Sequence, residues 1–204
     1  MIWHANSVSS IIFDHLSTRF VGRNDVGIAC LYLDYLNPEQ QTSEHMLGSL
    51  LQQFAAQKPS ILSKLEDLAK AMLEEGCENL TPDDTCRILA HDAMKSFDKI
   101  YICIDGLNEW EDAPMRDLLQ YVHEIGREYG GKLRLFVTTT RWKEYHLEEC
   151  LGIMPEDIRS GIQKFEETKK RDTTTCMNVI FESDEKEMNE ALKNEIISKA
   201  TSRR

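Results

Sequence analysis

Two apolar stretches of this chain each end in residues suited to a phosphate-bearing ligand. Tyr101–Ile104 runs into Asp105, and Leu133–Val137 runs through Thr138–Thr140 into Arg141. Each stretch is typical of a buried strand, and parallel α/β sheets bind their ligands at the carboxyl ends of the strands. A carboxylate at that edge can hold Mg²⁺, and a guanidinium can bind phosphate oxygens. The two strand ends therefore predict a magnesium–phosphate site.

Each candidate residue has a role that its side chain suits. We expect Asp105 to hold Mg²⁺ through water, Glu109 to polarise an attacking water, and Arg141 to contact a γ-phosphate. Thr140, next to Arg141, is a further candidate for binding the ligand. Structural alternatives stay open. Asp105 can begin an Asp-Gly turn with Glu109 capping a helix, and Arg141 can pair with a surface acid such as Glu144.

Other chemistries fit the residues less well. His146 and Cys150 have helical i, i+4 spacing, but a closed zinc site needs four ligands. The His123–Glu124 pair is followed by Arg127 where a metalloprotease has its second histidine. A phosphotransferase with an aspartate nucleophile would need an acid at Leu107. The sequence contains no G-x-S-x-G elbow for nucleophilic catalysis.

The part of a nucleotide site that grips the phosphates is missing from the sequence. No G-x-x-x-x-G-K-[ST] loop occurs in the 204 residues. The backbone amides of such a loop form the phosphate nest, and its lysine supplies positive charge. We therefore expect weak or absent hydrolysis of a nucleoside triphosphate.

The elements that must position these residues alternate between helices and strands. Apolar stripes at helical spacing predict helices over Ser7–Phe20, Ser43–Gln57, Pro59–Glu75, Thr81–Phe97 and Met115–Tyr129. The strands predicted between them are Val26–Tyr35, the stretch leading to Asp105, and the stretch beginning at Leu133. Strands that alternate with long helices form parallel sheets with helical crossovers. The predicted fold class is α/β, a three-layer sandwich with a mostly parallel sheet.

The C-terminal part of the chain carries a weaker pattern. We predict a charged helix over Pro155–Thr168, a short strand over Cys176–Phe181 and a closing helix over Glu185–Lys199. The predicted organisation is a core over residues 1–150, followed by an extension over 151–204 that is helical with one strand.

Composition excludes several classes of partner. The formal net charge of −11 disfavours binding to a nucleic-acid backbone, which needs clustered Lys and Arg. No apolar run approaches the roughly 20 residues of a membrane span, so we expect no membrane partner. The six cysteines form no C-x-x-C pair, which favours free thiols in a reducing compartment. The predicted location is cytoplasmic.

With these residues in view, the chain resembles a NACHT-type module of the STAND class of P-loop NTPases. It is most similar to the nephrocystin-like versions of fungal signalling proteins. IDGLNEW resembles the family's Walker B segment, which implies a magnesium role for Asp105, with Glu109 as the last acid and Asn108 replacing an Asp. LRLFVTTTR resembles the sensor-1 strand and makes Arg141 the sensor arginine. SSIIFDHL resembles the helix after the Walker A loop, and VGIACLYLDY resembles the second strand.

The sequence departs from the family at the Walker A loop. By the resemblance, the loop's Lys and Thr would fall near Ala5 and Asn6, and its glycines are absent as well. The strand that precedes this loop runs through the middle of the sheet in the family, and it would lie upstream of Met1. We therefore expect a P-loop NTPase-like sheet that lacks its first central strand.

The resemblance implies a module that binds ATP or GTP with Mg²⁺ and uses the bound state as an oligomerisation switch in signalling. For this chain we expect a degenerate or truncated form of that module. One alternative is a non-catalytic scaffold that assembles with itself or with full-length relatives through the helical faces around Lys64–Glu78 and Glu156–Lys170. Another is an active switch, a Mg-dependent nucleoside-triphosphatase, whose Walker A loop lies upstream.

Overall fold

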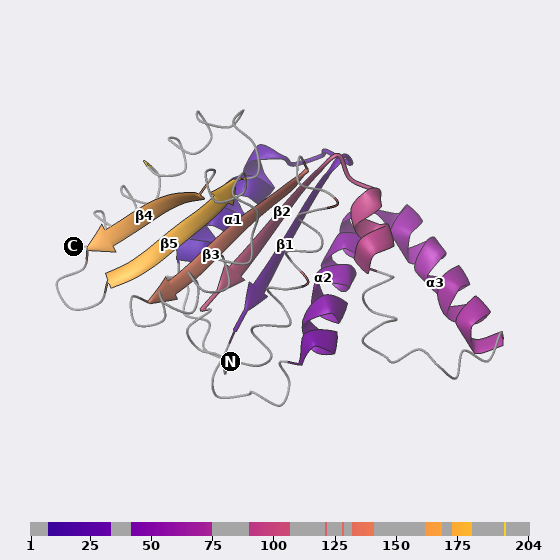
Figure 1. Cartoon of the computed structure of the whole chain (residues 1–204). Helices are drawn as coiled ribbons and strands as arrows, with labels where there is room; N and C mark the ends of the chain where they lie inside the picture. Colours follow the sequence, from indigo (N-terminus) through magenta and orange to yellow (C-terminus); the bar gives the residue numbers. More distant parts are fainter. Residues whose placement is uncertain are drawn as a thin grey trace.

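The chain folds into a twisted sheet with helices packed against both of its faces (Figure 1). A computed structural model describes residues 8–33, 42–74, 90–106, 121, 128, 132–140, 162–168, 173–180 and 194. The helices within these residues are α1 (Val8–Arg19), α2 (Ser43–Gln57) and α3 (Pro59–Glu74), together with a helical segment over 90–95. The strands are β1 (Val26–Tyr32), β2 (Lys99–Asp105), β3 (Leu133–Thr140), β4 (Ile162–Thr168) and β5 (Thr173–Ile180).

The five described strands form one sheet in the order β1-β2-β3-β5-β4. β1, β2 and β3 are parallel, whereas β5 runs antiparallel to β3 and β4 runs antiparallel to β5. The predicted α/β class with parallel strands is confirmed, and an antiparallel hairpin extends the sheet at one side. β1 and β2 are both buried through almost their whole length, as expected for parallel strands covered on two faces.

The middle of the parallel region is continuous. β2 and β3 are direct hydrogen-bonded neighbours, with a register that runs from Ile100 opposite Leu133 to Ile104 opposite Val137. The strands therefore leave no gap between the Asp105 strand and the Thr140 strand. That the sheet lacks the family's first central strand stays a prediction. Direct pairing satisfies the backbone groups that a lost strand would leave exposed.

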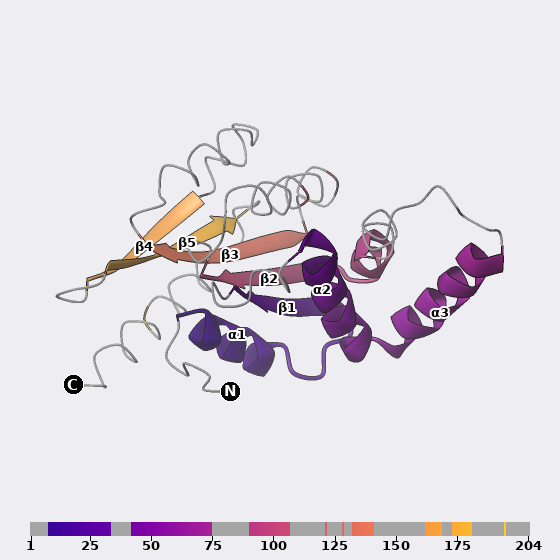
Figure 2. The same ribbon diagram turned by 90° about the horizontal axis from the view of Figure 1, so that it is seen from below.

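Two apolar clusters give the molecule its three layers. On one face, Ile12 and Leu16 of α1 pack against Val26, Tyr101 and Phe136 of the sheet. The cluster on the other face joins α2 and the segment over 90–95 to the opposite side chains of the same strands. Figure 2 shows the strands edge-on, with α1 lying along one side of the sheet. Successive side chains of a strand point to opposite faces, so β1, β2 and β3 each contribute to both clusters.

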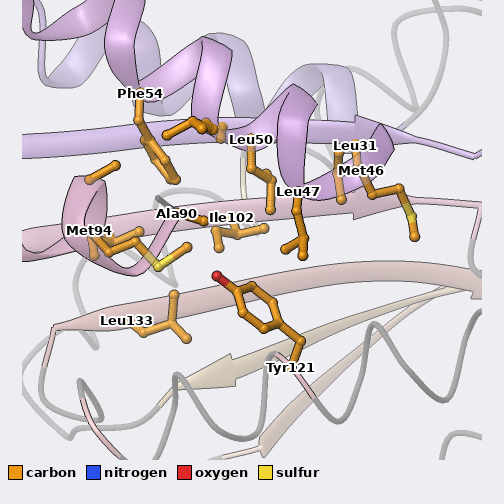
Figure 3. Packing of buried hydrophobic residues seen from close by; sticks show 14 of the residues in the cluster. Leu31, Met46, Leu47, Leu50, Phe54, Ala90, Met94, Ile102, Tyr121 and Leu133 are labelled. Carbon is orange, nitrogen blue, oxygen red and sulfur yellow. The ribbon is translucent and has the colours of Figure 1, made fainter. Parts of the chain in front are cut away.

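α2 illustrates how the sequence builds one of these layers. Its helix begins after Thr42, whose side chain accepts a hydrogen bond from the backbone N–H of His45. Its buried face is an apolar stripe at helical spacing that consists of Met46, Leu47, Leu50, Leu51 and Phe54. Figure 3 shows Leu47, Leu50 and Phe54 of α2 on one side of Ile102 of β2, with Tyr121 and Leu133 on the other side of the cluster. The predicted bounds of this helix, Ser43–Gln57, are confirmed.

Of the other predicted helices and strands, the structure confirms some and contradicts one. The helix predicted over Pro155–Thr168 is wrong over 162–168, because these residues pair as β4 with β5. The strand predicted at Cys176 is confirmed within β5, which already begins at Thr173. The segment over 90–95 confirms part of the helix predicted to end at Phe97, and the rest lies outside the described residues.

The helices predicted over Ser7–Phe20 and Pro59–Glu75 are confirmed as α1 and α3, and the strand predicted over Val26–Tyr35 is confirmed as β1, which ends earlier, at Tyr32. The helices predicted over Met115–Tyr129 and Glu185–Lys199 lie almost wholly outside the described residues. None of the described helices has both the length and the apolar character needed to cross a membrane.

Candidate functional site

The first turn of α1 lies against the carboxyl end of β2. There the Ser9 Oγ donates a hydrogen bond of 2.9 Å to the Asp105 Oδ1, across 96 positions of sequence. Ser9 is only 1% exposed, so its hydroxyl has been removed from water, whereas Asp105 is half-buried. This hydrogen bond is a polar link between α1 and the strand end, and hydrogen bonds to a charged carboxylate are stronger than those between neutral groups.

Tyr32 stands beside Asp105 on the neighbouring strand. It is the last residue of β1 and lies opposite Asp105 in the parallel register. The Tyr32 side chain is 43% exposed, and its partial removal from water is the main cause that raises the pKa of its hydroxyl above the usual value. The neighbouring Cys30 and Asp105 raise this pKa further, while a hydrogen bond with Ser10 lowers it. The phenol therefore stays neutral at physiological pH and can donate a hydrogen bond at this edge.

The backbone conformation changes directly after Asp105. Gly106 has φ of 75°, a conformation that favours glycine over residues with a side chain. The Asp105 carbonyl still accepts a hydrogen bond of 3.0 Å from the Leu33 N–H, so the strand pairing persists to its last residue. The residues that would complete an Asp-Gly turn lie outside the described part of the chain, so this structural alternative stays open. The Asp105 side chain itself lies at the strand end.

The oxygen atoms at this edge can be compared with the ligands that the implied magnesium ion needs. Asp105 and Ser9 offer hard oxygen atoms, which suit Mg²⁺, and Mg²⁺ needs only one or two carboxylates besides water and phosphate. Among the described residues no group of three or more His, Cys, Asp or Glu side chains could hold a metal by itself. The edge therefore fits Mg²⁺ that arrives with a phosphate, and does not form a closed metal cage.

The structure describes only some of the other predicted site residues. Thr140 is the last residue of β3, so its backbone lies at the same carboxyl edge of the sheet as Asp105. Glu109 and Arg141 lie outside the described residues, as do His146 and Cys150. The structure thus brings Asp105 and Thr140 to one edge and leaves the catalytic roles predicted for Glu109 and Arg141 as predictions.

Ser9, like Tyr32, is a site residue that the sequence analysis missed. Its only sequence signal is its place in the SSIIFDHL segment, at the start of a helix that resembles the one after a Walker A loop. A serine near a helix start is read first as a capping residue, and nothing in its local pattern points to a carboxylate 96 positions away.

A partial phosphate-loop pattern occurs elsewhere in the chain but lies at the wrong end of the sheet. The stretch from Gly126 to Lys132 matches G-x-x-x-x-G-K, and Leu133 follows where a Ser or Thr is required. Lys132 immediately precedes β3 at its amino end, where its Nζ donates a 3.3 Å hydrogen bond to the carbonyl of Phe97. This lysine therefore holds the start of the strand and cannot reach a ligand at Asp105.

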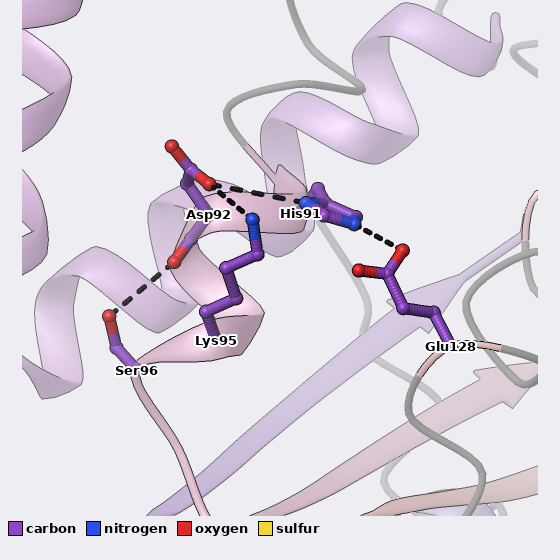
Figure 4. A network of polar contacts seen from close by, with 5 residues as sticks. All are labelled: His91, Asp92, Lys95, Ser96 and Glu128. Atoms are coloured by element: carbon purple, nitrogen blue, oxygen red, sulfur yellow. Dashed lines mark hydrogen bonds and ion pairs between the residues drawn. The ribbon is translucent and has the colours of Figure 1, made fainter.

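A second polar cluster lies on the helical segment over 90–95 (Figure 4). The His91 Nε2 contacts the Glu128 Oε2 at 2.5 Å, and the Lys95 Nζ lies 3.2 Å from the Asp92 Oδ1. These side chains are between one third and one half exposed, and exposed ion pairs contribute little free energy of folding. We assign this cluster to the solvated surface of the helical layer.

Comparison with known proteins gives one match. Residues 7–140 match the family model described as nephrocystin 3, N-terminal. The match spans more than half of the chain and runs from the start of α1 to the end of β3, so it contains both Ser9 and Asp105. Curated proteins and solved structures yield no match.

Proposed function

Because this chain belongs to the nephrocystin 3 N-terminal family, we propose that it is a NACHT-type signalling module of the STAND class whose nucleotide switch is disabled. The observation that carries this proposal is the set of charged groups expected around Asp105. Asp105, which accepts a hydrogen bond from Ser9, stands where an intact module would bind Mg²⁺ together with a nucleotide, but by the resemblance Ala5 and Asn6 replace the Lys and Thr of the phosphate-binding loop. The neighbouring hydroxyl is itself compatible with Mg²⁺, so the loss of the phosphate-binding groups is what supports a disabled switch.

Charge at the carboxyl edge supports the same conclusion. Asp105 is acidic, and Ala5 and Asn6 stand where the family's phosphate-binding Lys and the following Thr would be. A triphosphate carries several negative charges, which the Asp105 carboxylate repels. Without the loop's lysine and glycine amides, little positive charge offsets this repulsion. With Mg²⁺ bound, Asp105 and Ser9 would supply oxygen ligands, and the ion would offset phosphate charge. We expect this contribution alone to be too weak for a switch.

An interaction role follows from the position of α3. This helix contacts the body of the molecule through α2, and Figure 1 shows it extending away from the sheet. Ile61 is buried at its start, whereas Leu62 is 52% exposed and Lys64, Glu66 and Asp67 face the solvent. A charged helix with an exposed leucine can bind a protein partner, so the scaffold function is retained as the second candidate.

Equilibrium binding of fluorescent ATP and GTP analogues, in the presence of Mg²⁺, tests the disabled switch. We expect no saturable change in fluorescence as the nucleotide rises into the millimolar range, where a Kd corresponds to only about −4 kcal/mol. The Asp105→Asn variant is the control, since it removes the implied magnesium ligand. Tight binding by the natural chain that Asp105→Asn abolishes would show a working switch and overturn the proposal.

A further inference from the structure

β1 forms an edge of the described sheet, and its outward backbone groups are occupied by two glutamine side chains. The Ile28 N–H donates to the Gln57 Oε1 at 2.9 Å, and the Gln57 Nε2 donates back to the Ile28 carbonyl at 2.6 Å. Gln53 repeats this arrangement two residues along the strand. The Cys30 N–H donates to its Oε1 at 2.9 Å, and its Nε2 donates to the Cys30 carbonyl at 2.9 Å. We call these two side chains the glutamine clamp.

The two glutamines can each reach one residue of β1 because their spacing along α2 nearly equals the spacing of Ile28 and Cys30 along the strand. Two glutamines four positions apart on α2 are separated by about 6 Å along the helix axis. Ile28 and Cys30, two positions apart on β1, are separated by about 6.6 Å along the strand. Each amide can therefore pair with both backbone groups of one residue, as a neighbouring strand would. Figure 1 shows α2 running beside β1 at this edge.

The clamp is held in place by α2 itself. The Gln57 Nε2 also donates to the Gln53 carbonyl at 2.8 Å, and the Gln53 Nε2 donates to the Ser49 carbonyl at 3.2 Å. Both amide hydrogens of each side chain are therefore used, one on the helix and one on the strand. Such a saturated arrangement orients the amides before any contact with the strand.

Within its own sequence, β1 carries neither the charges nor the proline that protect many edge strands. Its sequence, VGIACLY, contains no charged residue and no proline, and its register with β2 runs without a break from Val26 to Tyr32. Edge strands of this kind pair readily with an identical strand, because no like charges repel one another. A cavity of about 420 Å³ lies along the same edge and is lined by Val26, Ile28 and both clamp glutamines. The edge thus has open space beside it as well as hydrogen-bonding groups.

We propose that the β1 edge is a latent self-association surface that the glutamine clamp keeps closed. Its occupant, once the clamp opens, is the β1 of a second copy of this chain in antiparallel orientation. With a two-fold axis at Ala29, the backbone groups of Ile28 pair with those of Cys30 on the other copy, and the reverse. This pairing uses the same four backbone groups per chain that the clamp occupies, so the clamp and the second copy exclude each other.

The test compares the full chain with the double variant Gln53→Met/Gln57→Met. Methionine keeps the length of the side chain but cannot form these hydrogen bonds. Gln52→Met, at an exposed position on the same helix, is the matched control. We expect the natural chain and Gln52→Met to be monomers by analytical ultracentrifugation at every concentration, and the double variant to form a dimer as its concentration rises.

Amide hydrogen exchange identifies the surface involved. In the dilute double variant the Ile28 and Cys30 amides should exchange about tenfold or more faster than in the natural chain. Their protection should return as the dimer forms. A folded double variant that stays monomeric overturns the proposal, and so does a dimer that leaves these two amides unprotected. If the double variant does not fold, Gln57→Met is used, and unchanged exchange of the Ile28 amide then overturns the proposal.

Discussion

Ser9, Tyr32 and Asp105 meet at the carboxyl edge although each is contributed by a different element. Their proximity follows from the parallel register of β1 and β2 and from the start of α1 on the same edge. Asp105 was predictable, because an apolar strand that ends in a carboxylate is a recognisable pattern. Ser9 and Tyr32 were not, because a single hydroxyl or phenol becomes part of a site only through tertiary packing.

The ionisation of Tyr32 reports on this environment. Its pKa is raised in the folded chain, chiefly by burial, with the Asp105 charge as a further cause. The folded state therefore keeps the phenol proton longer than the unfolded state does. This stabilising contribution is complete below the unfolded pKa of about 10 and is lost as the pH rises through the folded pKa.

The difference in absorbance between the natural chain and Tyr32→Phe, recorded near 295 nm during an alkaline titration, isolates this one tyrosine. We expect Tyr32 to ionise above its usual pKa, and Asp105→Asn to shift that ionisation to lower pH. An ordinary pKa for Tyr32 in the natural chain would contradict the described arrangement of the edge.

Among the helices and strands, some were predictable from the sequence and others were not, for different physical reasons. The α2 bounds were predictable, because its buried stripe and its capping threonine leave a periodic pattern. The glutamine clamp was not, since hydrogen bonds from a helix to a strand leave no such pattern. β4 was mistaken for a helix because Ile162–Thr168 is rich in Gln, Lys and Glu, which favour helices. Pairing with β5 overrides that local preference.

The close packing of Phe97 on Gly27 of β1 predicts the effect of a substitution at this glycine. A Cβ added at Gly27 would lie 2.9 Å from the Phe97 ring, which is 1% exposed and packs against Phe54. We expect Gly27→Ala to lower the free energy of unfolding by about 1–3 kcal/mol, as other overpacked cores do.

Gly48→Ala is the matched substitution within α2. A Cβ at Gly48 meets nothing within 4 Å, and alanine in a helix interior is favoured over glycine by about 0.5–1 kcal/mol. We expect it to raise the free energy of unfolding. Denaturant-induced unfolding of both variants checks the pair, and equal effects at the two glycines would contradict the packing of Phe97 on Gly27.

For the whole molecule, the sequence predicted the layers but not the order of the strands. Alternating helices and strands imply a three-layer α/β sandwich, and apolar clusters on both faces of the sheet confirm it. Strand order depends on which strands pair in space. β2 and β3 pair directly in the structure, so the described sheet has no gap at its centre. A continuous sheet with satisfied backbone groups is expected to unfold cooperatively.

Thermal unfolding of the chain with and without millimolar Mg-ATP or Mg-GTP tests the central claim, a folded module whose nucleotide switch is disabled. A ligand present at about 100 times its Kd adds about 2.7 kcal/mol to the free energy of unfolding, which shifts the midpoint measurably. We predict one cooperative transition with the same midpoint in all three conditions. A rise in the midpoint with either nucleotide, abolished by Asp105→Asn, would contradict the account.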